Sequence, residues 1–467
     1  MAKQRNFSDS LFTPVDAASL AVFRIGFGLI MLVEMWRYFR MDWIRRYYIT
    51  PQFHFSYYGF DWVQPWSETG MYLHFAALAL LAFFVAIGFL YRFSSIAFTL
   101  GFTWIFLLDQ TQYLNHFYLV ILLGVLLSVL PAQRAFSVDA WRQRRSGPAV
   151  VPVWTVWALR AQFEVLYLYA GIVKLNADWL RLEPMGLWMA RGADLPLIGP
   201  LMVEPLVVAV ASYGVIVLHL VGAPLLLWRR TRLAVLLIYT AFHIVNHFAF
   251  NIGIFPWLTL FGTLIFFEPD WPRRVWRALT SSTAAKVPAV PDGVAVSAAA
   301  VPAYQRRLII GLLCAWLALQ VLVPLRHLLY PGNVSWTEEG HRFAWQMMLR
   351  EKSGIARFTI VDPGSGRFWN ANLPDYLTQR QIRKMVTRPD MLLQFAHHLR
   401  WIWARENNLP GVAVHVTTAV SLNGRAPVAL VDPERDLAAT PRNLQPADWI
   451  LPLAEPLPAT TLQRLLD

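Results

Sequence analysis

The sequence is poor in charge and in cysteine. Only 15% of its 467 residues are Asp, Glu, Lys or Arg, whereas a soluble domain carries roughly a quarter. Because 56% of the residues are hydrophobic, the chain has too little polar surface to cover itself in water, and we expect a membrane protein. The single cysteine, Cys314, excludes an intrachain disulfide and a thiolate metal cluster. Any domain in an oxidising compartment must therefore be held together by packing.

Lysine is also rare, so the net charge of +12 comes almost wholly from arginine. An excess of arginine can indicate nucleic-acid binding, but in a membrane protein it first reports the topology of the loops. We therefore expect no nucleic-acid partner. The few lysines are Lys3, Lys174, Lys286, Lys352 and Lys384.

Apolar runs predict a polytopic α-helical membrane protein with about nine transmembrane helices. Several runs are shorter than the ~20 residues that cross ~30 Å of hydrocarbon, so the count is approximate. The first run is longer than a signal-peptide core and lacks a small-residue cleavage site, so we expect no removable targeting segment. The runs are 16–36, 71–91, 95–108, 116–131, 156–173, 204–228, 232–250, 252–268 and 307–327.

The arginines lie in alternate connections between these runs, near positions 92, 134–145, 229–232 and 273–277. The intervening short loops carry no basic residue. Cytoplasmic loops carry the excess of Lys and Arg, so we expect the N-terminus and the arginine loops to be cytoplasmic. Nine crossings then place the C-terminal region on the opposite side of the membrane.

The chain divides into four parts. We expect residues 1–278 to form a transmembrane domain that holds the functional site, and residues 279–303, which are small and punctuated by proline, predict a flexible cytoplasmic linker. Residues 304–330 contain the last transmembrane helix. Residues 331–467 predict a small extracytoplasmic α+β domain. Its expected strands are 357–361, 412–420 and 427–431, and its expected helix is 391–405.

Polar residues inside the apolar runs are the candidates for function, because ionisable groups at membrane depth are costly unless they are paired or hydrated. Lys174 lies at the outer end of the fifth run. A lysine that only extends its amine to the interface is the alternative reading. In a chain that uses arginine almost everywhere else, this lysine indicates that an amine able to lose its proton is needed.

Two further helix ends carry polar side chains at the same outer depth. Asn115 and His116 open the fourth run, where Asn115 also suits a helix cap. His243 and His247 are i,i+4 neighbours at the end of the seventh run. That spacing suits a metal, but no HExxH base, cysteine or carboxylate lies nearby in the sequence, and we expect no metal. The three helix ends together predict one shared polar pocket.

At these residues the sequence resembles the vitamin K-dependent γ-glutamyl carboxylase family, including its bacterial relatives with a horizontally transferred transmembrane (HTTM) domain. Order and spacing agree over about 15–350, and the lysine segment together with the two histidine segments makes the resemblance specific. The matching segments are AVFRIGFGLIM, YYGFDWVQP, LDQTQYLNHFYL, AFSVDAW, LRAQFEVLYLYAGIVKLNADWL, FHIVNHFAFNIGIFPW and EPDWPRRV, and RHLLYPGNVSWTEEGHRFAWQMMLREKSG in the C-terminal region.

The resemblance implies catalysis by Lys174 and His116, with Asn115 and His243 binding the cofactor. The implied cofactor is reduced vitamin K, either phylloquinone or menaquinone hydroquinone, used with O2 and CO2. Its oxygenation to the epoxide is coupled to carboxylation of a glutamate in a peptide or protein. Desolvation in an apolar pocket disfavours the ammonium form of Lys174 and leaves a general base. The family also places Trp345, Met347 and Met348 beside the site, where we expect them to close over the quinone, with ordinary core packing of an amphipathic segment as the alternative.

The sequence also departs from the animal members of this family. They are longer, they have a disulfide that one cysteine cannot form, and they carry a second lysine where this chain has Val173. We therefore expect a bacterial inner-membrane protein with a periplasmic C-terminal domain, or an endoplasmic reticulum protein in a eukaryote. Two other functions stay open: a hydroquinone epoxidase that does not carboxylate peptides, and a transporter or lipid-binding membrane scaffold.

Overall fold

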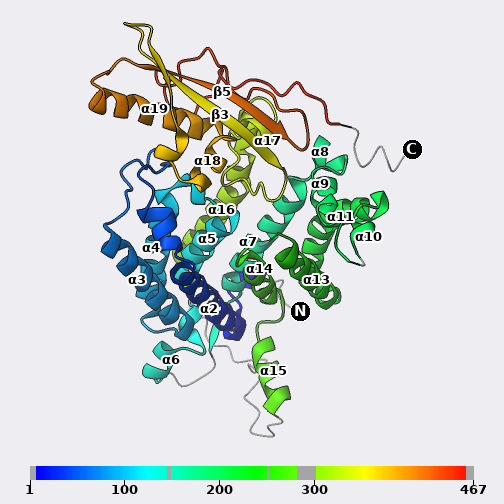
Figure 1. The fold of residues 1–467 in the computed structure, drawn as a ribbon. Helices are drawn as coiled ribbons and strands as arrows, with labels where there is room; N and C mark the ends of the chain where they lie inside the picture. Colours follow the sequence, from blue (N-terminus) through cyan, green and yellow to red (C-terminus); the bar gives the residue numbers. More distant parts are fainter. Residues whose placement is uncertain (1–6, 145–148, 197, 251, 281–300, 459–467) are drawn as a thin grey trace.

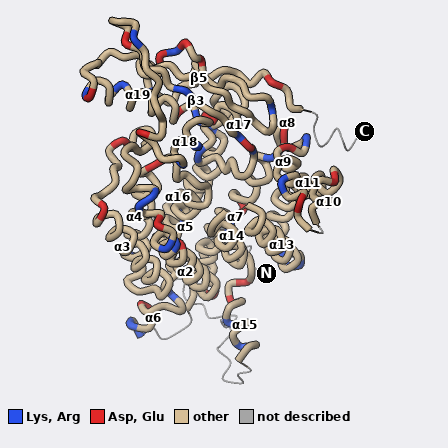
Figure 2. The backbone as a smooth tube through the Cα atoms, viewed as in Figure 1, with Lys and Arg blue, Asp and Glu red and all other residues tan. Residues whose placement is uncertain are grey.

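The computed structural model describes residues 7–144, 149–196, 198–250, 252–280 and 301–458. A bundle of helices forms the larger part of the molecule, and the C-terminal domain covers one end of it (Figure 1). The short helices α6 (Val138–Arg142) and α15 (Trp271–Thr280) lie at the opposite end. Charged residues are sparse along the bundle and frequent in the C-terminal domain (Figure 2).

Within the described residues, six helices are long and apolar enough to cross a membrane, which makes the chain a multi-pass membrane protein. All nine predicted runs are helical, but three do not meet this standard, so the count of nine crossings stays a prediction. Two of the three are short, namely α5 (Asn115–Val129) and the segment Phe255–Phe266, and the third is α7 (Val153–Ile172). The six are α2 (Ala18–Arg40), α3 (Glu68–Ile87), α4 (Tyr91–Leu108), Pro205–Leu227, α13 (Arg232–Phe250) and Ala303–Leu329.

Several long segments combine smaller elements. Pro205–Leu227 consists of α11 (Pro205–Val217), the π-helical turn η4 (Leu218–Gly222) and α12 (Ala223–Leu227). Segment Phe255–Phe266 begins with α14 (Phe255–Thr263), and the last segment begins with α16 (Ala303–Leu325). The remaining α-helices are α1 (Phe7–Leu11), α8 (Ala177–Leu180), α9 (Met185–Ala190), α10 (Gly199–Met202), α17 (Val334–Thr337), α18 (Gln379–Met385) and α19 (Pro389–Glu406).

Helix α2 is central to the bundle and packs closely on α3. A Cβ atom on Gly28 would lie 2.6 Å from the backbone nitrogen of Ala86, so only glycine permits this approach. The start of α2 is tied to the start of α7 by a two-stranded antiparallel sheet of β1 (Pro14–Asp16) and β2 (Val150–Pro152). Helices α2 and α7 therefore begin from one fixed point.

The C-terminal domain is built on an antiparallel sheet of order β4-β3-β5, formed by β3 (Lys352–Val361), β4 (Phe368–Asn370) and β5 (Ala413–Leu422). Side chains alternate along a strand, so Phe358 and Ile360 share one face and are fully buried with Phe395 of α19. The expected helix is confirmed as α19, and the turn at 362–366 leads from β3 into β4.

Two details of this domain differ from the sequence-based expectation. Strand β4 was not predicted, and residues 427–431 do not form a strand but take part only in isolated bridges. The hydroxyl oxygen of Thr418 accepts hydrogen bonds from the backbone nitrogens of Leu430 and Val431, at 2.8 and 3.4 Å. A side chain thus takes the place of a neighbouring strand in satisfying this backbone.

The predicted linker falls mostly on residues 281–300, which lie outside the described residues. Its expected start is wrong by two residues, because α15 continues through Leu279 to Thr280. This helix alternates arginines with apolar residues at helical spacing, and that pattern extends it past the predicted boundary.

Buried polar contacts fix the C-terminal domain on the helical part. The guanidinium of Arg425 donates two hydrogen bonds to the carboxylate of Asp178 on α8, at 2.7 and 2.8 Å. The amide of Asn423 donates a third to the same carboxylate at 2.8 Å. All three side chains are buried. A bidentate pair of this kind fixes orientation as well as distance.

Candidate active site

Lys174 lies two residues beyond the end of α7, in the interface between the bundle and the C-terminal domain. Its amine donates hydrogen bonds to the carbonyl oxygens of Ala170, at 2.9 Å, and Met347, at 3.3 Å. It also lies 5.0 Å from the centre of the Trp179 ring. The side chain is buried, and within the described residues no carboxylate forms an ion pair with it. An amine in such a place is held by carbonyl oxygens and an aromatic face alone.

Asn115 contacts the same loop of the C-terminal domain. Its amide nitrogen donates to the carbonyl oxygen of Gln346 at 3.3 Å, and its amide oxygen accepts from the hydroxyl of Tyr113 at 2.9 Å. That hydroxyl in turn accepts a hydrogen bond from the backbone nitrogen of Phe343 at 2.7 Å. The expectation that Asn115 caps the helix is wrong, because Leu114 occupies the N-cap position and the side chain of Asn115 bonds to Tyr113 and Gln346 instead.

The loop over these residues, 343–348, has an unusual backbone. Phe343, Trp345 and Met348 have φ angles of 62°, 53° and 46°. This left-handed region costs a residue with a side chain about 1–3 kcal/mol, and it persists where surrounding contacts impose it. Here the contacts come from Lys174 and Asn115 described above. Backbone of this kind gathers at functional sites, so we call residues 343–348 the site loop.

The three predicted aromatic and methionine residues lie on the site loop but differ in surroundings. Trp345 is fully buried, with its ring 5.1 Å from the ring of Tyr118. Met347 contributes its carbonyl oxygen to the amine of Lys174. The side chain of Met348 is 39% exposed and lines a neighbouring polar pocket. The expectation that all three cover a quinone stays a prediction.

His116 and His243 are brought together through one ring. The ring centre of Phe255 lies 6.1 Å from that of His116 and 6.0 Å from that of His243. Nε2 of His243 lies 3.2 Å from the hydroxyl of Thr259, while its Nδ1 is buried and has no partner. His247 instead lies against Trp257, with 5.3 Å between ring centres. The described residues contain no group of three or more His, Cys, Asp or Glu side chains placed to hold a metal ion.

Sequence reasoning missed His219, which belongs to the same cluster. Its ring centre lies 5.7 Å from that of Tyr239, which stacks at 5.9 Å on His243. It packs against α7 at Gly171, where an added Cβ would lie 3.1 Å from the Cβ of His219. A single histidine in an apolar run gives no spacing signal. In the structure, His219 lies in the π-helical turn η4, and such turns are frequent at functional sites.

Comparison with known families decides how this arrangement is interpreted. Residues 12–271 match the HTTM domain, and residues 305–456 match the lumenal domain of vitamin K-dependent gamma-carboxylase. No solved structure matches the chain. The chain belongs to the vitamin K-dependent γ-carboxylase family. Both parts of this carboxylase-family protein meet at Lys174, since the amine lies in the first matched region and its Met347 partner in the second.

The carboxylase-family chain also has a basic pocket beside the site loop. Its volume is about 360 Å³, and Met348 forms part of its wall. Figure 2 shows basic residues close to α18, which contributes to this wall. Glu338 is the only acidic residue of the lining and is already occupied, because Arg350 and His341 contact its carboxylate. The basic lining residues are Arg350, Lys352, Arg383, Lys384 and Arg388.

Burial changes the proton affinity of one lysine in this pocket. The pKa of Lys384 is lowered to about 7, chiefly by burial and also by the nearby guanidinium groups of Arg388 and Arg380. The carboxylate of Glu338 opposes this effect. Lys384 is therefore charged below neutral pH and loses that charge above it. The pocket has an excess of positive charge and suits an anionic group.

Proposed function

We propose that this protein is a vitamin K-dependent γ-glutamyl carboxylase that couples epoxidation of the hydroquinone to carboxylation of a peptide glutamate. The observation that supports this most directly is the buried amine of Lys174. It is held by the carbonyl oxygens of Ala170 and Met347 and has no acidic partner among the described residues. When bound, the hydroquinone supplies, with O2, the strong base that removes the γ-hydrogen of glutamate, so that CO2 can add.

Lys174 has the role of general base in this proposal. A neutral amine takes a proton from the hydroxyl of the hydroquinone, and the resulting ammonium is stabilised by the two carbonyl oxygens and the ring of Trp179. Burial favours the neutral form before the reaction. Asn115, adjacent to His116, supports the site loop. His116 either orients the amine or stabilises the developing negative charge.

The polar atoms left without partners suit a quinone. Nδ1 of His243 and the indole nitrogen of Trp345 are both buried and have no hydrogen-bond partner among the residues that the structure describes. Buried polar groups are nearly always satisfied, so such atoms are candidates for contact with a ligand. A quinone presents two oxygens on opposite edges of its ring. The aromatic surroundings of His243 also exclude water, which protects a strong base.

The basic pocket favours the carboxylase over a simple epoxidase. It lies directly beside the site loop, since Met348 lines it while Met347 contacts Lys174. A hydroquinone and O2 bring no carboxylate to this place, whereas a glutamate side chain does. Arginine and lysine side chains bind carboxylates through charge-assisted hydrogen bonds. We therefore assign this pocket to the peptide glutamate.

The test is a product assay. Purified protein is incubated with reduced vitamin K, O2, labelled CO2 and a glutamate-containing peptide, and both products are measured. A carboxylase gives quinone epoxide and γ-carboxyglutamate in coupled amounts. Epoxide without labelled peptide indicates the epoxidase. If neither forms while the protein binds lipid or an ion, the site belongs to a transporter or scaffold.

A pH dependence of peptide binding is expected from Lys384. With hydroquinone absent, the Kd for a glutamate peptide should rise about tenfold between pH 6 and pH 8.5, because one charge-assisted hydrogen bond worth about 1.5 kcal/mol is lost with the proton. Lys384→Met should bind weakly at both pH values, whereas Lys384→Arg should bind tightly at both. Any pH dependence of the Kd that remains in Lys384→Met is attributed to Lys352. Burial lowers the pKa of Lys352 to about 7 as well. A Kd that does not change with pH in the unmodified protein contradicts the assignment.

The orientation in the membrane is a second proposal, with the C-terminal domain periplasmic in a bacterial inner membrane. It is supported by the position of α6 and α15, which carry arginines, at the end of the bundle opposite to this domain (Figure 1). In a Cys314→Ser background, Gly364→Cys in the exposed turn of 362–366 is expected to react with an impermeant thiol reagent in intact spheroplasts. Labelling only after lysis shows the reverse orientation.

A further inference from the structure

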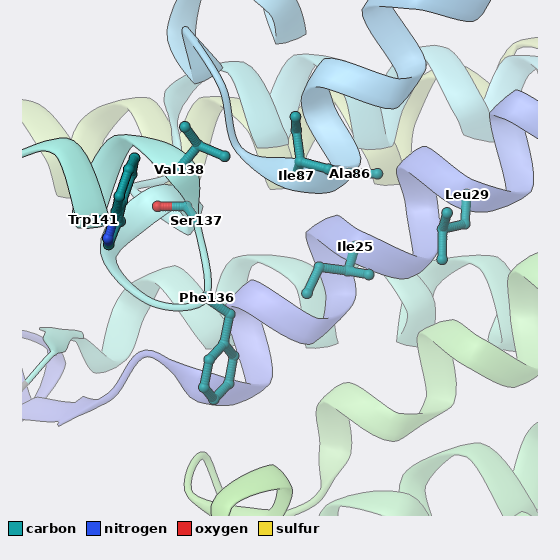
Figure 3. A pocket seen from close by; sticks show the side chains of 8 residues that line it. All are labelled: Ile25, Leu29, Ala86, Ile87, Phe136, Ser137, Val138 and Trp141. Carbon is teal, nitrogen blue, oxygen red and sulfur yellow. The ribbon is translucent and has the colours of Figure 1, made fainter.

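An apolar groove lies on the flank of the bundle, away from the catalytic site. Its volume is about 440 Å³, and its walls come from α2, the end of α3 and the segment that enters α6. Figure 3 shows the side chains of Ile25 and Leu29 along one wall, Ile87 on the next and Trp141 at the far edge. Of these, Leu29 is 48% and Trp141 79% exposed.

The groove lies at the depth where lipid headgroups meet acyl chains. Ile25 is seven residues into α2, about 10 Å from its start, and Ile87 is the last residue of α3. Both helix ends are on the side of the bundle opposite to the C-terminal domain (Figure 1). Exposed tryptophan is typical of this interface, since its ring is apolar and its N–H is polar. The groove therefore faces lipid.

Arginine side chains lie on two sides of the groove. Behind its wall, the guanidinium of Arg24 is fully buried and donates to the carbonyl oxygens of two lining residues, Ala86 and Phe136. Its Nε has no partner, and within the described residues no carboxylate forms an ion pair with it. At the rim, exposed Arg142 follows Trp141 and lies 5.6 Å from the ring of Phe89.

The nearby carboxylates do not cancel this charge at the rim. Asp139 is turned to the start of α4, where it accepts hydrogen bonds from the backbone nitrogens of Leu90 and Tyr91 at 3.0 and 2.8 Å. Asp16 is paired with Arg273, at 2.9 Å, on the other side of Phe136. Arg142 is thus exposed and forms no ion pair within the described residues.

We propose that this groove is a binding site for an anionic phospholipid of the leaflet opposite to the C-terminal domain. One acyl chain lies against Ile25, Leu29 and Ile87, the ring of Trp141 packs at the level of the glycerol, and the phosphate pairs with Arg142. The apolar walls fit an acyl chain of any lipid. The guanidinium of Arg142 selects a negative headgroup. This site is independent of the carboxylase proposal, because none of its residues belongs to the catalytic site.

The test uses the full chain in phosphatidylcholine nanodiscs containing a trace of photoactivatable lipid, with crosslinked peptides mapped by mass spectrometry. A phosphatidylglycerol probe should label residues 25–29 and 86–87 or 136–141 at least fivefold more than a phosphatidylcholine probe. Arg142→Gln should reduce phosphatidylglycerol labelling to the phosphatidylcholine level. Leu29→Trp, which fills the groove, should reduce labelling by both probes.

Leu237→Trp is the matched control, since Leu237 is also an exposed leucine of a long apolar helix, 61% exposed on α13, and lies outside the groove. It should leave labelling of the groove unchanged. A monodisperse elution profile and an unchanged melting temperature show that each variant is folded. Equal labelling by the two probes, absence of labelling in the groove, or equal effects of Leu29→Trp and Leu237→Trp would overturn the proposal.

Discussion

Lys174→Ala is expected to abolish epoxide formation and carboxylation together, by a factor of at least about 10³, because a positioned general base contributes roughly 10²–10⁴ to the rate. Both products depend on the same proton abstraction, so their ratio should not change as they disappear. The measurement is initial rate of each product with saturating hydroquinone, in protein shown to bind the quinone.

Further variants separate the charge of this residue from its bulk. Lys174→Arg should fail as Lys174→Ala does, since a guanidinium keeps its proton at any accessible pH. A small exogenous amine should partly restore Lys174→Ala, and more so as the pH rises toward the pKa of that amine. His116→Ala should keep some activity if His116 only orients the amine. Near-normal epoxidation by folded Lys174→Arg shows instead that another group is the base, with His116 the first to test.

Asp178→Ala is expected to lower the free energy of unfolding by about 3–5 kcal/mol, because it leaves the guanidinium of Arg425 buried without its partner. Asp178 and Arg425 join the two matched regions of the chain, so the C-terminal domain should loosen first. Activity should fall as well, since the site loop then no longer holds Lys174. Thermal unfolding in detergent and the rate of proteolysis within the C-terminal domain measure the two effects.

Matched variants show whether the effect of Asp178→Ala comes from the unpaired charge. Asp178→Leu combined with Arg425→Met should recover much of the stability, since apolar residues of similar volume often replace a buried ion pair without loss. Asp448→Ala removes one partner of the exposed pair Arg435–Asp448 and should cost at most about 1 kcal/mol. Equal destabilisation by Asp448→Ala and Asp178→Ala would contradict the explanation.

The parts of the site that sequence predicts are those with strong local signals. Lys174 and Asn115 stand out because polar residues in apolar runs are rare and costly. The helices follow from the same runs, since a backbone in lipid must satisfy its own hydrogen bonds. The structure then brings Lys174 and Asn115 to one loop, and joins His116 to His243 through Phe255.

The parts that escape prediction involve groups without a sequence signature. Every residue has a carbonyl oxygen, so nothing in the sequence marks that of Met347 as the partner of Lys174. The site loop uses Phe343, Trp345 and Met348 at positive φ, where pattern rules look for glycine. The pairing of Asp178 with Arg425 joins residues that are 247 positions apart. Only the folded arrangement reveals contacts of these kinds.

The contact between Lys174 and the carbonyl of Met347 joins residues that are made at very different times. Synthesis proceeds from the N-terminus, and domains generally fold as they emerge. The amine is therefore in place long before its partner, and 173 positions of chain must follow before the pair can form. A ribosome that stalls in this interval leaves a membrane protein in which the amine of Lys174 has been made but the carbonyl of Met347 has not, and in which later helices of the bundle are still missing. Under the proposed function, only a chain made at least as far as the site loop has the geometry in which Lys174 acts as the base.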